Sequence, residues 1–255
     1  MITTKNITKY FGSFQALQDV SFEINKGEIV GFLGQNGAGK TTLMRILTSY
    51  LPASSGTIMI DGDDIAKNSL TIRQKIGYLP ENPPLYENMT VKDYLRFAAE
   101  IKDVQLKQRR SQLDKVLEEC HIRNVMHNTI ETLSKGYKQR VGIAQAIIHE
   151  PKILILDEPT SGLDPVQNLQ VRNLIKDLKE KRTVILSTHI LSEIEQIAHR
   201  VLIIKSGRII VDEALETLLK TQDDTKGTQL LETQSSRLTL EEVFIKLHSE
   251  SNEES

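Results

Sequence analysis

The chain has 255 residues, 39% of them hydrophobic, and its formal net charge at pH 7 is −2. This length can bury a sizeable core, in one large domain or in one domain with a lobe. The nearly balanced charge excludes a global basic field, so we expect no nucleic-acid partner. The single cysteine, Cys120, excludes an intrachain disulfide and is typical of a reducing compartment.

The sequence has no window near the roughly 18 apolar residues that a membrane span requires, and segment 1–11 has no signal-peptide pattern. We therefore expect a soluble, cytosolic chain. If it serves a membrane process, another chain must supply the membrane part.

Strand patterns dominate the first 60 residues. Val20, Phe22 and Ile24 alternate with polar residues, a β-rich run follows Gly56, and 28–33 is a short apolar strand candidate. Beyond this strand, apolar residues recur at helical spacing, which predicts an amphipathic helix with one buried face. The predicted buried face consists of Leu43, Met44, Ile46, Leu47, Tyr50 and Leu51.

Helical patterns dominate from about 88 to 150, and Cys120 shares a helical face with apolar residues, which favours core packing for it over reactivity. Strands and helices then alternate. Strands are expected at 153–156, 183–187 and 201–205, and helices after Asp164 and over 190–198. Asp164 followed by Pro165 is a helix-start pattern, with the aspartate as N-cap.

This alternation predicts an α/β fold with a parallel sheet and helices on its faces. We expect one domain over residues 1–220, with the helical stretch of about 82–150 inserted as a lobe. Residues 221–255 are expected to form a C-terminal extension. The polar segment 220–229 favours a loop, 238–247 favours a short helix, and the tail 249–255 favours disorder.

Residues 34–42, GQNGAGKTT, fit the phosphate-loop pattern G-x-x-x-x-G-K-[ST]. Glycines let successive backbone N–H groups point at phosphate oxygens, at the positive end of the following helix. Lys40 is expected to reach the β- and γ-phosphates, and the Thr41 hydroxyl to ligate Mg²⁺. The alternative is a glycine-rich turn with an exposed lysine. The expected phosphate-site residues are Gly34, Gln35, Asn36, Gly37, Ala38, Gly39, Lys40, Thr41 and Thr42.

Two acids and a histidine follow later apolar strands. Asp157 ends the strand at 153–156, which places its carboxylate at the sheet edge where ligands of α/β sheets bind, as a Mg²⁺ ligand. Glu158 is the candidate general base that polarises an attacking water. His189 follows another strand and is expected beside the γ-phosphate. Alone, the two acids also fit a helix cap, and the histidine a structural role.

With these residues in order, the sequence resembles the nucleotide-binding subunit of an ABC transporter, over residues 1 to about 220. LSKGY at 133–137 matches the family's signature segment LSGGQ, and SGLD at 161–164 matches its D-loop. The longer runs are similar to single-domain ATPases of bacterial ABC exporters of the drug, polysaccharide and gliding-motility type. The resemblance implies a P-loop fold with a mixed or parallel core sheet, an N-terminal antiparallel β-subdomain and an inserted helical subdomain.

The resemblance also implies an ATPase with Mg²⁺ and two kinds of partner, a second nucleotide-binding subunit and membrane permease subunits. Each ATP of the head-to-tail pair lies between one phosphate loop and the other subunit's signature segment. It implies catalytic roles for Glu158 and His189 and nucleotide contacts for Ser134, Gly136 and Asp164. Phe11 matches the aromatic that stacks on adenine, with Tyr10 beside it as the alternative. The expected location is the cytoplasmic face of the membrane.

The sequence departs from the family pattern at three positions. Glu81 stands where the family has glutamine, as a metal and γ-phosphate contact, and Lys135 and Tyr137 replace glycine and glutamine. Lys135 either faces the partner's ATP or points to solvent. Two other functions remain open: a nucleic-acid or ribosome-associated member of the family, and a small-molecule kinase that shares only the phosphate loop.

Overall fold

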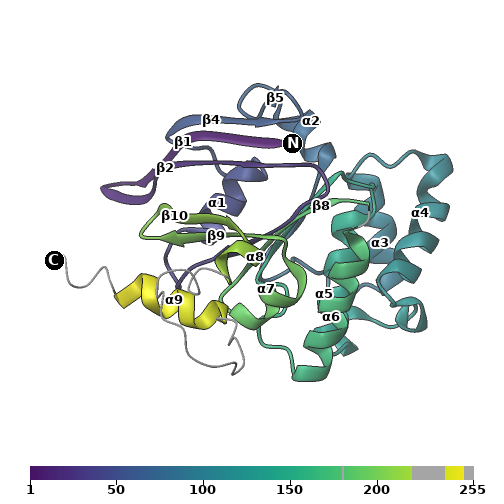
Figure 1. The fold of residues 1–255 in the computed structure, drawn as a ribbon. Helices are drawn as coiled ribbons and strands as arrows, with labels where there is room; N and C mark the ends of the chain where they lie inside the picture. The colour runs from purple at the N-terminus through teal and green to yellow at the C-terminus, as the bar shows by residue number, and fades with distance from the viewer. Residues whose placement is uncertain (180, 220–238, 250–255) are drawn as a thin grey trace, which may run out of the picture.

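The structure is a computed structural model that describes residues 1–179, 181–219 and 239–249. Two sheets organise it (Figure 1). The first is antiparallel, with the strand order β2-β1-β4-β5. Its strands are β1 (Ile2–Phe11), β2 (Phe14–Ile24), β4 (Ser55–Ile60) and β5 (Asp63–Asp64).

The second sheet has the order β10-β9-β3-β8-β7-β6. All its pairings are parallel except that of β10 with β9, which is antiparallel. The predicted parallel sheet is therefore confirmed, with one antiparallel edge strand that makes it mixed. Its strands are β3 (Ile29–Leu33), β6 (Ile76–Leu79), β7 (Ile153–Asp157), β8 (Thr183–Thr188), β9 (Arg200–Lys205) and β10 (Arg208–Ala214).

Helices cover both faces of this second sheet. α1 (Lys40–Leu47) lies between the two sheets, and the helices from α3 to α7 gather on the opposite face (Figure 1). The other α-helices are α2 (Ser69–Lys75), α3 (Val91–Ile101), α4 (Leu106–Glu119), α5 (Lys135–Ile147), α6 (Pro165–Leu178), α7 (Leu191–Ile197), α8 (Leu215–Leu218) and α9 (Leu240–Ser249). Two short 3₁₀ turns are η1 (Arg123–Val125) and η2 (Ile130–Thr132).

The core lies in two layers, one on each face of the second sheet. Leu43 and Met44 of α1 pack with Phe32 of β3 and with the antiparallel sheet. On the other face, Leu154 and Leu156 of β7 pack against the helices. Every residue of β3, β7 and β8 is buried. A strand covered on both faces needs a continuous run of apolar residues. This need explains why the sequence predicts all three strands.

The expected α/β fold, with an antiparallel β-subdomain and an inserted helical subdomain, is confirmed. The burial predicted for Cys120 is also confirmed, since its side chain is fully buried and burial raises the pKa of its thiol. The boundaries 1–220, 82–150 and 221–255 stay predictions. The helix expected at 238–247 corresponds to α9, whereas the loop at 220–229 and the tail beyond Ser249 lie outside the described residues.

The helix after the phosphate loop is shorter than predicted. α1 ends at Leu47 and Ser49 takes a left-handed φ of 54°, so the chain turns away before Tyr50. The N–H groups of Tyr50 and Leu51 bond back to the Arg45 carbonyl, which is a helix-ending arrangement, and Pro52 follows it. The Tyr50 side chain is 75% exposed. The prediction that Tyr50 belongs to a buried helical face was wrong.

Candidate functional site

The glycine-rich loop joins β3 to α1 and requires glycine at Gly39. Its φ is 111°, and a Cβ there would lie 2.9 Å from the Ala16 carbonyl oxygen. Gly39 is the N-cap of α1 and offers no side-chain cap. The first N–H groups of a helix have no carbonyl partner within it. This helix therefore presents its donors and the positive end of its dipole to an anion.

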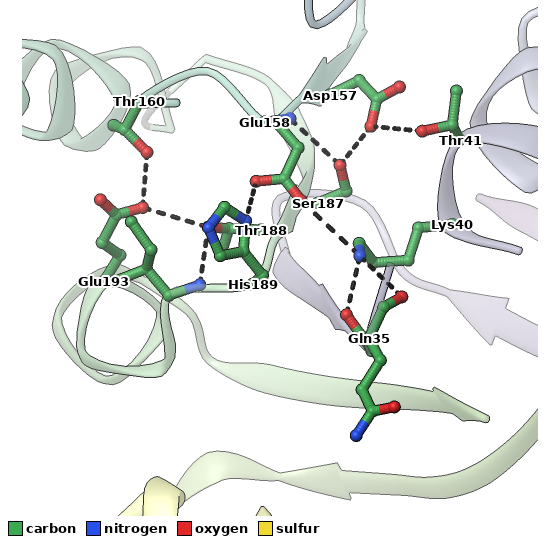
Figure 2. Close-up of polar contacts among 12 residues, drawn as sticks. Gln35, Lys40, Thr41, Asp157, Glu158, Thr160, Ser187, Thr188, His189 and Glu193 are labelled. Carbon is green, nitrogen blue, oxygen red and sulfur yellow. Dashed lines mark hydrogen bonds and ion pairs between the residues drawn. The ribbon is translucent and has the colours of Figure 1, made fainter. Parts of the chain in front are cut away.

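Lys40 lies buried at the start of α1, with its ammonium group inside the loop. Its Nζ donates to the carbonyl oxygen of Gly34 at 2.7 Å and to that of Gln35 at 3.3 Å. The same Nζ lies 3.6 Å from Glu158 Oε1, in an ion pair whose two side chains are less than 10% exposed (Figure 2). The loop thus holds a desolvated cation next to its glycines.

Asp157 ends β7 with its carboxylate buried below the loop. Its Oδ1 accepts from Ser187 Oγ at 2.5 Å and from Thr41 Oγ1 at 3.4 Å (Figure 2). Its Oδ2 is buried and has no hydrogen-bond partner among the described residues. A buried carboxylate oxygen without a donor is expensive unless it ligates a cation. Asp157 and Thr41 together therefore fit Mg²⁺, which prefers hard oxygen ligands.

No group of three or more His, Cys, Asp or Glu side chains able to hold a metal occurs among residues 1–179, 181–219 and 239–249. The donor set at Asp157 is accordingly small, one carboxylate and one hydroxyl. Mg²⁺ in phosphate sites typically takes one or two carboxylates and completes its shell with phosphate oxygens and water. The site therefore matches a metal that arrives with a phosphate rather than one held by the protein alone.

Glu158 follows directly and is held in a strained backbone conformation. Its φ is 49°, and its N–H donates to the carbonyl oxygen of Ser187 at 3.0 Å and to Ser187 Oγ at 3.1 Å. Its Oε2 lies 2.8 Å from His189 Nδ1, which comes from the end of β8. The carboxylate is 7% exposed. A left-handed glutamate fixed between a lysine and a histidine is an arrangement found at functional sites.

One pocket of about 510 Å³ is lined by Lys40, Thr41, Glu158 and His189. Phe11 lines its outer side, whereas Tyr10 does not line it, and Glu81 lines it from the segment after β6. Sequence reasoning missed three lining residues, Phe14, Ala16 and Ser161. Phe14 pairs with Phe11 across the β1–β2 hairpin, so both exposed rings stand at the rim. The full lining is Phe11, Phe14, Ala16, Gln35, Asn36, Gly37, Gly39, Lys40, Thr41, Thr42, Glu81, Glu158, Ser161 and His189.

Six of the expected site residues do not line this pocket. Asp157 is buried and meets the lining through its contact with Thr41. Gly34 packs against β9, where a Cβ would lie 2.5 Å from the Ile204 carbonyl oxygen, and Ala38 is buried in the loop. The other three, Ser134, Gly136 and Asp164, lie on α5 and at the start of α6.

Ser134 and Asp164 cap the two helices at whose N-termini they lie. Ser134 Oγ accepts from the Tyr137 N–H at 3.4 Å, and Asp164 Oδ1 accepts from the N–H groups of Val166 and Gln167 at 3.0 and 2.9 Å. A Cβ at Gly136 would lie 2.9 Å from the side chain of Gln167, so the two helix starts touch there. Ser134 and Asp164 are both exposed. They form a second surface, separate from the pocket.

Lys135 is exposed, and the choice between its two expected alternatives stays a prediction. Its ammonium group lies against Gly162, where it would collide with a Cβ on that residue, and Gly162 has a φ of 67°. Lys135 therefore contacts segment 161–164 of its own chain. Tyr137 packs its ring against the Arg140 guanidinium, 4.2 Å from the ring centroid, and its hydroxyl accepts from Asn124.

Comparison with known proteins shows the family to which the chain belongs. Residues 17–161 match the ABC transporter family. The bacitracin transport ATP-binding protein BcrA of Bacillus licheniformis is 37% identical over 246 residues, which cover 96% of this chain and 79% of that protein.

Solved structures support the same family assignment. The structure of an ATP-binding subunit of an ABC transporter superposes with a TM-score of 0.82 at 29% identity, covering 97% of this chain and 99% of that one. A dimeric ATP-binding cassette in a post-hydrolysis state, bound to ADP and Pi, superposes with a TM-score of 0.76 at 26% identity, covering 84% and 99%. Within the described part of the chain, no helix has both the length and the hydropathy to cross a membrane.

Proposed function

Since the chain belongs to the ABC transporter family, as a subunit that binds and hydrolyses ATP, we propose that the pocket holds Mg²⁺–ATP and that its hydrolysis drives export through separate membrane subunits. One observation carries the proposal. An uncapped helix N-terminus, the Lys40 ammonium and the Glu158 carboxylate, groups that serve phosphate binding and water activation, face the same pocket.

The phosphates are bound by the loop. Backbone N–H groups at the start of α1 and the Lys40 ammonium bind the β- and γ-phosphates, and Lys40 exchanges its present carbonyl partners for phosphate oxygens. Thr41 and Asp157 would hold Mg²⁺, which would neutralise charge on the phosphate oxygens. Phe11 stacks on the adenine ring, and Phe14 borders the same side of the pocket.

Glu158 is the general base. Its carboxylate accepts a proton from the attacking water, whose oxygen forms a bond to the γ-phosphorus as the bond to the bridging oxygen of ADP breaks. His189, already hydrogen-bonded to Glu158, fixes the orientation of that carboxylate and stands beside the γ-phosphate. Glu81 lines the same pocket and would contact Mg²⁺ and the γ-phosphate there.

The second surface completes the site of another subunit. Ser134, Gly136 and Asp164 lie exposed or at a helix junction outside their own pocket, which suits contact with the ATP held by a partner subunit in a head-to-tail pair. The Ser134 hydroxyl and the first N–H groups of α5 then add donors for a γ-phosphate. Because ADP lacks that phosphate, ATP stabilises the closed pair more than ADP does, as a ligand-driven switch requires.

Purification from membranes tests the transport part of this proposal. A tagged chain should co-purify with an integral-membrane protein, and its ATPase rate in reconstituted vesicles should rise when transported substrate is present and fall on chelation of Mg²⁺. Recovery without any membrane protein would refute it. ATP-dependent accumulation in inverted vesicles tests the direction, because an exporter moves substrate toward the side opposite the ATP-binding subunits.

A further inference from the structure

Glu193, in the first turn of α7, is a carboxylic acid that sequence reasoning assigned no role. Its side chain is 2% exposed. Its Oε2 accepts from Thr160 Oγ1 at 2.6 Å and from Thr188 Oγ1 at 3.3 Å (Figure 2). Its Oε1 accepts from Asn168 Nδ2 at 2.5 Å. In the described part of the chain, its hydrogen-bond donors are thus two hydroxyls and an amide rather than a cation.

Two of these donors bracket segment 161–164. Thr160 directly precedes the segment and lies two residues after Glu158, while Asn168 lies in the first turn of α6, just after it. The single carboxylate of Glu193 therefore holds the chain on both sides of the segment that Lys135 also touches. The segment's position is fixed relative to α7.

The third donor fixes the position of His189. Thr188 immediately precedes the histidine, and its hydroxyl donates to Glu193 while accepting from the Ile190 N–H at 3.1 Å. The backbone is thus anchored on both sides of His189. His189 in turn bonds Glu158, so a chain of contacts runs from segment 161–164 through Glu193 to the catalytic carboxylate.

A buried acid of this kind is not explained by stability alone. Removing a carboxylate from water without a cation costs several kcal/mol, which is offset only when every donor is in place. An apolar side chain of similar volume is often as stabilising at a buried charged site. The carboxylate instead stabilises one arrangement of the three segments that carry its donors. Other arrangements are disfavoured because they would break these hydrogen bonds.

We propose that Glu193 is a positioning residue for ATP hydrolysis, which holds segment 161–164 and His189 in one fixed arrangement around Glu158. The proposal rests on the ATPase activity of the pocket. Because Glu193 does not line the pocket, it acts through Thr160, Asn168 and Thr188 and leaves the phosphate loop untouched.

The test is Glu193→Gln, which keeps the size of the side chain. In the part of the chain that the structure describes, the buried Asn168 Oδ1 has no hydrogen-bond partner. A flipped Asn168 amide can therefore accept from the new amide at 193, and the fold is expected to persist. We expect kcat for ATP to fall about tenfold and KM to stay within about twofold. Glu195→Gln is the matched control, because Glu195 lies on the same helix but bonds the Leu240 N–H of α9. Its kinetics should equal those of the unaltered chain.

A double-mutant cycle separates positioning from general destabilisation. In a His189→Ala background, measured by single turnover, Glu193→Gln should lower the rate clearly less than it does in the unaltered chain, because one of the two groups that Glu193 positions is gone. Thr188→Val and Thr160→Val each remove one hydrogen-bond donor to Glu193 and should each lower kcat several-fold. These two variants test the positioning role independently if Glu193→Gln lowers the melting temperature strongly.

Normal kcat in Glu193→Gln, or a tenfold loss that persists in full in the His189→Ala background, would overturn the positioning role. Normal kcat in both threonine variants would overturn it as well. Absence of ATPase activity in the unaltered chain would instead refute the pocket's assignment as an ATP-hydrolysing site, so the two failures are distinguishable.

Discussion

The pocket and the surface formed by Ser134 and Asp164 differ in what their polar groups contact. In the pocket, side chains from distant parts of the sequence bond one another, as Lys40 does with Glu158 and Thr41 with Asp157. On the surface, Ser134 and Asp164 bond only backbone N–H groups two or three residues away, as ordinary helix caps do. The fold of a single chain assembles the pocket. The surface, in contrast, would be completed by a ligand that this chain does not position there. If the two regions are halves of one ATP site, altering either must stop hydrolysis, but by different routes.

The largest effect is expected in the pocket. Glu158→Gln keeps the shape of the side chain but removes the base, so kcat should fall about 10³-fold, within the range of general-base catalysis. ATP binding should persist, and pairs of subunits should accumulate in the closed, ATP-bound state. Steady-state hydrolysis and size-exclusion chromatography with ATP measure the two effects.

Glu23→Gln, at an exposed position of β2, is the matched control and should behave like the unaltered chain. A Glu158→Gln chain that hydrolyses ATP within a few-fold of the normal rate would contradict the general-base role.

The second effect tests the surface. Ser134→Arg places a long cation where the partner's phosphate loop must approach. The cost of burying it, about 4 kcal/mol, should lower pair formation and hydrolysis on the order of 10³-fold or somewhat less. ATP binding to the single subunit should stay normal, because Ser134 lies outside its own pocket. Equilibrium binding and ATPase assays at matched protein concentration measure the difference.

Ser111→Arg, on the exposed face of α4, adds the same side chain away from both regions and should leave hydrolysis unchanged. Loss of ATP binding in Ser134→Arg, or normal hydrolysis, would show that the surface is not half of the site.

The same comparison explains what the sequence could predict. The phosphate loop, Asp157, Glu158 and His189 follow buried strands whose apolar runs are visible without the structure, and the C-terminal ends of parallel strands meet at one edge. Local pattern was therefore enough to bring these residues together. The family resemblance, rather than local pattern, singled out Ser134, since its geometry is that of any N-cap.

Residues whose role depends on tertiary contacts could not be predicted. Phe14 reaches the pocket only because the β1–β2 hairpin pairs it with Phe11. Glu193 looks like a solvated residue of a first helical turn, and its burial follows from the packing of α7 between segments far away in sequence. Tyr50 had the right spacing for a buried face, but the left-handed Ser49 ends the helix before it.

The smallest effect is expected at Glu81, where the pocket meets the segment that leads into the helices from α3 onward. Glu81 is exposed and lines the pocket, so Glu81→Gln removes a negative charge near the phosphates without disturbing the core. Affinity for ATP should change little, since Lys40 and the loop carry most of the binding. Turnover coupled to transport should change about two- to fivefold, the scale of one exposed charge interaction of up to about 1 kcal/mol. Vesicles that contain the membrane partner measure it, with the exposed Glu131→Gln as control. Unchanged transport-coupled hydrolysis in Glu81→Gln would mean that this carboxylate does not link the pocket to the rest of the transporter.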